Sequence, residues 1–229
     1  MSVAGKVILI TGAARGLGFE YARAFGAAGA SVVAGDVADC AASAEAMAAA
    51  AVKAFGRIDA LINNAALYGS LRGGRFNAIA EADWDAAMAV NVKGIWNCCK
   101  AVVPAMRQSG GGSIINVASL AATYGMPFAL HYTTSKAAVI GLTRGLAREL
   151  GRDDIRVNAL APSAVMTEGT AEFLGDKLDR GLDVIRAGQS IQRTLVPGDL
   201  TGTVVWLISD GSKFVTGQTI AVDGGTVML

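Results

Sequence analysis

The sequence predicts an α/β fold with a doubly wound parallel sheet, formed by residues 1–229 as a single domain. Short aliphatic runs alternate with helical patterns, which is typical of strands that are buried on both faces. A glycine-rich turn follows the first run directly, and hydroxyl or amide side chains follow later runs. Open α/β sheets place their chemistry at the carboxyl ends of their strands. No internal repeat, linker or block of charge divides the sequence.

Composition excludes several classes of function. The 229 residues are 52% apolar, enough for a large core and a buried subunit contact. Lys and Arg number 20 against 19 for Asp and Glu, so we expect no binding to nucleic acid or to an anionic membrane. The stretch 108–135 lacks charged residues, but it is too rich in Gly, Ser, Thr and Asn to span a membrane.

The cysteines favour a reducing compartment. Cys40, Cys98 and Cys99 are an odd number with an adjacent pair, which is not typical of a disulfide framework or a metal site. Residues 1–6 lack a basic segment followed by an isolated apolar stretch, so no signal peptide is expected. We therefore expect a cytoplasmic protein without a metal centre.

The first strand, turn and helix form a unit suited to a dinucleotide. The unit comprises the strand Val7–Ile10, the turn Thr11–Gly18 and the helix Phe19–Ala28. Gly12 allows the sharp turn, Gly16 lets the backbone approach a pyrophosphate, and Gly18 lets the helix pack closely on the strand. The spacing differs from the commoner Gly-x-Gly-xx-Gly. A glycine-rich turn without a ligand is the alternative interpretation.

The second strand is expected at Ser31–Gly35 and ends in Asp36. A carboxylate about twenty residues past the glycines can accept a hydrogen bond from a ribose 2′-hydroxyl. It also repels a 2′-phosphate. The alternative is an Asp that begins a turn. An alanine-rich helix over Cys40–Phe55 follows.

The third strand, Ile58–Ile62, leads into Asn63-Asn64-Ala65-Ala66 and a glycine-containing loop over Leu67–Asn77. A helix is then expected over Trp84–Gln108. It contains Asn91 beside a glycine, a locally unfavourable choice that indicates a packing or chemical role. A bond from Asn91 to nearby backbone is an equally good explanation.

The next strand, Ser113–Ala118, ends at Ser119, and a helix follows over Tyr132–Leu150. Tyr132 and Lys136 are four residues apart, which puts both side chains on one face of this helix. An ammonium beside the phenol is expected to lower its pKa from about 10, giving an acid and base usable near neutral pH. Such a pair alone is usually a surface feature. The hydroxyl of Ser119 at a strand end favours a catalytic interpretation.

The C-terminal third contains further strands and helices. They are a strand at Ile155–Leu160, a helical lid within Glu168–Pro197, a helix at Leu200–Ser209 and a strand at Thr219–Val222.

Six motifs occur in order: Thr11-Gly12-xxx-Gly16-x-Gly18, Asn63-Asn64-Ala65, Asn91, Ser119, Tyr132-xxx-Lys136 and Pro162-xxxx-Thr167. Together they resemble a short-chain dehydrogenase/reductase of the single-domain type, over nearly the whole chain. The resemblance implies a Rossmann-like sheet that binds NAD or NADP. It also implies an enzyme that interconverts a small secondary alcohol and a ketone by hydride transfer. Ala66 and Ser163 stand where glycine is usual in the family.

The resemblance assigns four catalytic residues. Tyr132 would exchange a proton with the substrate oxygen, and Lys136 would lower its pKa and hold the nicotinamide ribose. Ser119 would hydrogen-bond the substrate oxygen, and Asn91 would support a water that carries the proton to solvent. Cofactor contacts are expected from Gly12, Arg15, Gly16, Leu17, Gly18, Asp36, Asn64, Ala65, Tyr132, Lys136, Val165 and Thr167. His131 could enter the substrate pocket or face elsewhere.

We expect NAD rather than NADP, because Asp36 favours a free ribose diol, although Arg15 could meet a 2′-phosphate or pair with Asp36. We also expect a homo-oligomer, a tetramer, since the helices Trp84–Gln108 and Tyr132–Leu150 look too apolar to face water. Two other functions stay open: a cofactor-binding sensor or scaffold without turnover, and an isomerase or dehydratase with a tightly held cofactor.

The 27 residues from Asp36 to Asn63 hold one helix and one strand, but not two crossovers. The family normally places another helix and an edge strand here. We expect both elements to be lacking, unless this stretch of the sequence is incomplete. Asp36 would be either the ribose ligand or the surviving tip of the missing strand. The adenosine end of the cofactor would then be exposed and its affinity weak.

Overall fold

The computed structural model describes residues 1–36 and 40–228 of the chain. At its centre lies one parallel sheet of six strands in the order β2-β1-β3-β4-β5-β6. The strands are β1 (Val7–Thr11), β2 (Ser31–Gly35), β3 (Ala60–Asn63), β4 (Gly112–Val117), β5 (Ile155–Pro162) and β6 (Thr219–Val222). The strand order reverses beside β1, which creates the switch point where such sheets bind ligands. The predicted doubly wound, Rossmann-like sheet is confirmed.

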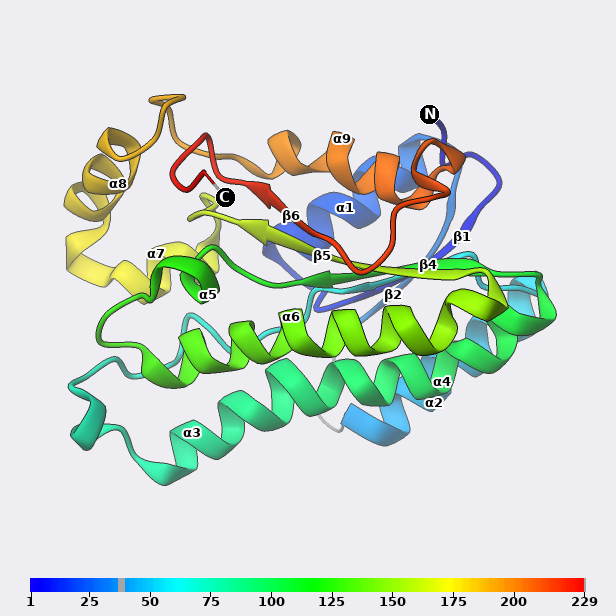
Figure 1. Ribbon diagram of the computed structural model, residues 1–229, viewed down its shortest axis with the longest axis horizontal. Coiled ribbons are helices and arrows are strands. Elements are labelled where there is room, and N and C mark those ends of the chain that lie inside the picture. The colour runs from blue at the N-terminus through cyan, green and yellow to red at the C-terminus, as the bar shows by residue number, and fades with distance from the viewer. Residues whose placement is uncertain (37–39, 229) are drawn as a thin grey trace.

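Helices cover both faces of the sheet (Figure 1). One face carries α1 (Gly16–Ala27) and α9 (Pro197–Ile208), and the other carries α2 (Cys40–Phe55), α4 (Gly94–Gln108) and α6 (Leu130–Leu150). Alternate residues of β1 enter the two layers: Leu9 packs toward α2, α4 and α6, while Ile8 and Ile10 pack toward α1 and α9. Both faces of the strand are therefore apolar, which explains its uninterrupted aliphatic run.

The lid predicted within Glu168–Pro197 is helical. It consists of α7 (Glu168–Leu174), a short 3₁₀ turn and α8 (Leu178–Ala187). Figure 1 shows α7 and α8 at the left, beyond the carboxyl ends of β5 and β6. The lid therefore lies at the edge of the sheet where the candidate site residues gather.

The prediction of one continuous helix over Trp84–Gln108 is wrong. The chain forms α3 (Glu81–Met88), a π-helical turn over Ala89–Lys93, and then α4. A π turn inserts one extra residue and is common at functional positions. Here it centres on Asn91, whose buried side chain bonds elsewhere rather than to the backbone beside it. A four-residue helix, α5 (Ala121–Tyr124), was also not predicted.

The expected loss of an edge strand agrees with the sheet. In the described residues β2 pairs only with β1, so β2 is an edge strand, and α2 alone connects it to β3. Asp36 directly follows β2 and therefore lies at the tip of the strand next to β1, not on a remnant of a lost strand. Val37, Ala38 and Asp39 lie outside the described residues.

Candidate active site

A first cavity of about 420 Å³ lies over the glycine turn between β1 and α1. Gly12 has φ +65°, and a Cβ there would lie 2.7 Å from the Cα of Ala65. Gly16 has φ +57°, and its missing Cβ would point at Thr167 across the cavity, 3.7 Å from that side chain. The side chain of Arg15, the residue before the first turn of α1, makes no capping hydrogen bond. The turn thus offers open backbone N–H groups and the positive end of a helix, a cradle that fits the pyrophosphate of a dinucleotide.

Asn64 and Thr11 tie this turn to the end of β3. The Asn64 Nδ2 donates to the carbonyls of Thr11 and Gly12, at 3.1 and 3.0 Å. The Thr11 Oγ1 accepts bonds from the backbone N–H groups of Asn64 and Ala65, at 3.1 and 3.0 Å. Gly18 packs against the Gly12 carbonyl and the Asn64 amide, which leaves no room for a side chain. Thr11 was not among the predicted site residues, although it directly precedes Gly12.

Arg15 and Asp36 both line this cavity, but the hydrogen bonds of the Arg15 guanidinium go to Glu172 and not to Asp36. The Arg15 guanidinium makes a two-pronged ion pair with Glu172 of α7, which raises the pKa of Arg15 and lowers that of Glu172. The Asp36 carboxylate accepts a bond from the backbone N–H of Ala14 at 3.2 Å. The lid therefore reaches over the glycine turn and holds the basic residue that could have met a 2′-phosphate.

A second cavity of about 490 Å³ adjoins the first, and Leu17, Asn64 and Thr167 line both. Its wall holds Ser119, two residues past β4, and Tyr132 and Lys136 of α6. The structure thus brings the predicted catalytic hydroxyl, phenol and amine into one cavity.

Tyr132 is almost completely buried and shares a cavity wall with Ser119. Burial and the neighbouring Tyr68 raise the pKa of Tyr132, while the Ser119 side chain partly opposes this. The expectation that Lys136 lowers this pKa is wrong for the chain alone. The Lys136 Nζ donates to the carbonyl of Val117 at 2.7 Å and lies 5.8 Å from the centre of the Tyr132 ring. Burial lowers the pKa of Lys136 itself to about 8.

Asn91 is completely buried and acts on the loop after β3. Its Oδ1 accepts from the Leu67 N–H at 2.7 Å, and its Nδ2 donates to the Leu67 carbonyl at 3.2 Å. The Nδ2 also donates to Ser135 Oγ at 3.0 Å, one residue before Lys136. Asn91 does not line either cavity, so its side chain positions the loop and α6 from behind. The alternative of a bond to nearby backbone is wrong, because the bonded backbone is 24 residues away, while the expected role of Asn91 in proton transfer stays a prediction.

Sequence reasoning missed an aromatic stack beside Tyr132. The centre of the Tyr68 ring lies 5.0 Å from that of the Tyr132 ring, and Tyr68 also stacks with Phe173 of α7, with ring centres 4.6 Å apart. Burial raises the pKa of Tyr68 to about 12, and the Thr170 side chain partly opposes this rise. An exposed-looking loop with three glycines gave no signal for this contact. The stack joins the lid to the proposed proton donor.

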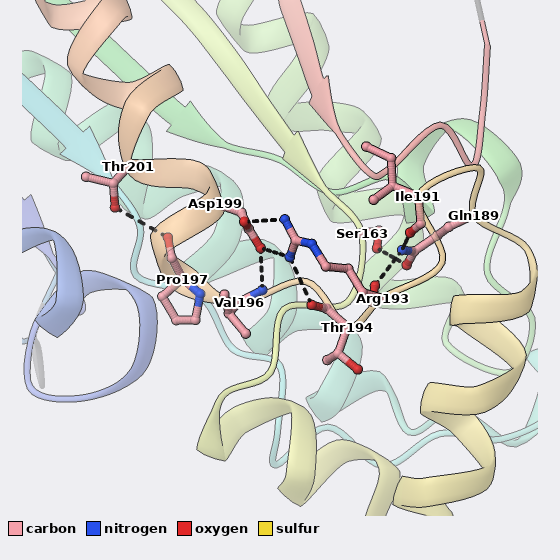
Figure 2. Close-up of polar contacts among 9 residues, drawn as sticks. All are labelled: Ser163, Gln189, Ile191, Arg193, Thr194, Val196, Pro197, Asp199 and Thr201. Atoms are coloured by element: carbon pink, nitrogen blue, oxygen red, sulfur yellow. Dashed lines mark hydrogen bonds and ion pairs between the residues drawn. The ribbon is translucent and has the colours of Figure 1, made fainter.

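The segment after α8 returns to the sheet through polar contacts, which Figure 2 shows. Gln189 donates to the carbonyls of Ile191 and Arg193, both at 2.9 Å, and the Arg193 guanidinium pairs with Asp199 at 2.6 Å. This return carries Leu195 into a parallel bridge with Val165. Val165 and Thr167, the expected cofactor contacts after β5, are thereby fixed in the cavity wall.

His131 is completely buried and is absent from the described lining of the second cavity, so it does not enter the substrate pocket. Helices long and apolar enough to span a membrane are not found in the described residues.

Residues 32–227 match the family described as enoyl-(acyl carrier protein) reductase. A 3-oxoacyl-(acyl-carrier-protein) reductase, FabG of Thermotoga maritima, is 37% identical over 253 positions and aligns along the whole of both chains. The chain belongs to the short-chain dehydrogenase/reductase family. It is therefore an NAD(P)-dependent oxidoreductase acting on small molecules. The alignment with the Thermotoga reductase is longer than the 229 residues of this chain, in keeping with the reduced sheet edge.

Solved structures agree with this assignment. A Beutenbergia cavernae protein, assigned as an NAD(P)-dependent gluconate 5-dehydrogenase and solved with NADP at low occupancy, is 32% identical with a TM-score of 0.89. The aligned region covers 98% of this chain and 98% of the Beutenbergia chain. Levodione reductase is 27% identical with a TM-score of 0.88, covering 96% of this chain and 97% of its own. We expected NADP to be less likely than NAD, and the NADP bound to the Beutenbergia relative corrects this expectation. The cofactor site of the family admits either molecule.

Proposed function

We propose that this enzyme interconverts a secondary alcohol and a ketone, with Tyr132 as the acid and base. The observation that supports this most directly is the shared wall of the second cavity, which holds the Tyr132 phenol, the Ser119 hydroxyl and the Lys136 amine. The adjoining glycine cradle fits the pyrophosphate of NAD(P). When bound, the nicotinamide supplies the hydride donor or acceptor.

The chain's own residues then transfer one proton to the substrate oxygen and stabilise the negative charge that develops on it. During ketone reduction Tyr132 donates its phenolic proton to the substrate oxygen as that oxygen gains negative charge. Ser119, which lines the same cavity as Tyr132, donates a hydrogen bond to the same oxygen. Lys136 helps return a proton to Tyr132 because its pKa of about 8 allows proton exchange near neutral pH. Asn91 holds Leu67 and Ser135, and so supports the geometry of both walls.

For the choice of cofactor we propose NAD. A 2′-phosphate near Ala14 would approach two carboxylates, those of Asp36 and Glu172, while Arg15 is already engaged by Glu172. Repulsion between like charges at short range opposes that arrangement. Comparing kcat/KM for NAD and NADP tests the proposal, and a higher value with NADP overturns it.

The oligomer also stays a proposal. Trp96 on α4 is 47% exposed, beneath the Lys100 ammonium at 4.4 Å, and α4 lies beside α6 on the same layer. Burial of such a face against a second copy would remove apolar surface from water. Light scattering at micromolar concentration should give a homotetramer, and a monomer refutes the proposal.

A panel of secondary alcohols, offered with NAD and with NADP and read by the absorbance of reduced nicotinamide, tests the reaction. We expect reduced cofactor to accumulate in proportion to ketone formed. Binding of cofactor without turnover of any alcohol or ketone would favour the sensor or scaffold. Turnover without accumulation of reduced cofactor would favour the isomerase or dehydratase.

A further inference from the structure

Nearly all the side chains that line the cavity beside Tyr132 are uncharged. Aromatic or aliphatic side chains from α5, α7, α8 and the loop after α5 form a large part of the wall: Tyr124, Met126, Phe173, Leu174, Val184 and Ile185. Among the described residues that line this cavity, Lys136 alone carries a charge. The Lys136 Nζ lies at the reacting end and already donates to the Val117 carbonyl at 2.7 Å. The opposite end of the cavity therefore offers no counter-charge to a substrate.

Hydroxyl groups in this wall are largely engaged. The Thr170 Oγ1 donates to the Val165 carbonyl at 2.6 Å, and the Thr226 Oγ1 donates to the Asp223 carbonyl at 2.7 Å. Ser163 Oγ is bonded to the Gln189 side chain at 3.5 Å. An ionised group desolvated here would lose its water and gain little in exchange, whereas an alkyl or aryl group would gain from burial.

We infer that the substrate is an uncharged, apolar ketone or secondary alcohol, and that the wall formed by the lid residues Phe173, Leu174, Val184 and Ile185 excludes carboxylate-bearing substrates. The inference rests on the proposed function and narrows it. A free oxo acid or hydroxy acid is a poor substrate, while a ketone of the same shape with an alkyl end is a good one.

Two isosteric ketones separate these cases. 5-Methyl-2-hexanone and 4-oxopentanoate have the same chain to the branch point, and an isopropyl group in the first replaces the carboxylate of the second. We expect kcat/KM for the neutral ketone, measured with saturating reduced cofactor, to be higher by about 100-fold. If neither ketone is reduced, both are compared as inhibitors of the oxidation of the alcohol that the panel identifies. The neutral ketone is then expected to have the lower inhibition constant.

A substitution in the lid tests whether the apolar wall causes the preference for the neutral ketone. Val184 lines the cavity yet is 67% exposed, so Val184→Lys places an ammonium at the wall without burying it in a packed core. The preference for the neutral ketone should fall by about fivefold or more. Val52→Lys, at a 39% exposed position on α2 remote from the cavity lining, is the matched control and should leave the preference unchanged.

The outcomes are distinct. Equal or better use of 4-oxopentanoate by the unaltered enzyme overturns the inference while the proposed function stands. An unchanged preference in a folded Val184→Lys protein also overturns it, because the wall then does not set the selectivity. If no compound of either panel is oxidised or reduced, the proposed function itself fails, and the inference fails with it.

Discussion

Lys136→Met is predicted to stabilise the protein at neutral pH while removing turnover. Lys136 is 2% exposed, and burial lowers its pKa from 10.5 to about 8. A shift of this size corresponds to about 3 kcal/mol, by which the folded state is disfavoured when the amine is charged. The substitution also removes the bond to the Val117 carbonyl, which costs about 1–2 kcal/mol. We therefore expect a net gain of about 1–2 kcal/mol at pH 7.

The stability advantage of Lys136→Met should depend on pH in a defined direction. Below pH 8 the amine is protonated in both folded and unfolded chains, so the whole penalty is present. Between pH 8 and 10.5 the unfolded chain holds a proton that the folded chain has released, so the unaltered protein gains stability with rising pH. The advantage of Lys136→Met should therefore shrink across this window, and reverse near its upper end because the lost hydrogen bond remains.

Urea unfolding at pH 7 and at pH 10 measures the difference, with Lys53→Met on the exposed end of α2 as the control. At pH 7 the midpoint of thermal unfolding should rise by roughly 2–8 °C for a chain of this length. A variant that is less stable than the unaltered protein at pH 7 would refute the reasoning. So would an advantage that stays constant from pH 7 to pH 10.

Four further substitutions test the framework of the site. Gly12→Ala should lose about 1–3 kcal/mol of stability and weaken NAD binding, because φ is +65° and the added Cβ meets backbone at 2.7 Å. Gly26→Ala in α1, where the Cβ meets nothing, should instead gain about 0.5–1 kcal/mol by urea unfolding. Asn91→Ala leaves buried backbone groups unpaired and should cost about 2–4 kcal/mol, with a fall in kcat; unchanged values of both would contradict its positioning role. Asp199→Asn should cost about 1 kcal/mol above pH 4. The Arg193 guanidinium lowers the pKa of Asp199 to about 2, so its contribution is lost as pH falls through that value, and an acid unfolding curve identical to that of the unaltered protein would be the opposing result.

The elements with clear start and stop signals were predicted from the sequence with their bounds. The strands Ser31–Gly35 and Thr219–Val222 and the helix Cys40–Phe55 match the structure residue for residue. A glycine or an aspartate directly follows each of these segments, and such residues favour the end of a strand or helix. The helix expected at Leu200–Ser209 begins earlier, at Pro197, because proline is well suited to the first helical turn.

The site was predictable as a set of residues but not as a set of contacts. The order of the motifs identified Ser119, Tyr132 and Lys136, which share one cavity. It did not reveal that the Lys136 ammonium bonds to Val117 or that Tyr68 raises the pKa of Tyr132, since both depend on tertiary packing. Local patterns carry no information on partners brought together by distant segments.

The lid contributed most of what was missed. Its sequence indicated a helical cover with apolar residues, but not that adjacent residues of α7 act on different partners. Glu172 binds Arg15 at the glycine turn, while Phe173 stacks on Tyr68 beside the phenol. Such pairs join segments more than 100 residues apart, and periodicity within either segment cannot specify them.

The central claim is that the Tyr132 hydroxyl moves the proton, and Tyr132→Phe tests it most directly. Phe keeps the ring that packs against Tyr68 and removes only the hydroxyl. The measurement is kcat together with the dissociation constant of the cofactor, for the unaltered enzyme and for Tyr132→Phe, with the alcohol that the panel identifies. We predict that turnover falls by about 100-fold or more while cofactor affinity stays within about twofold. Substantial turnover by a folded Tyr132→Phe enzyme that binds cofactor normally would contradict the assignment.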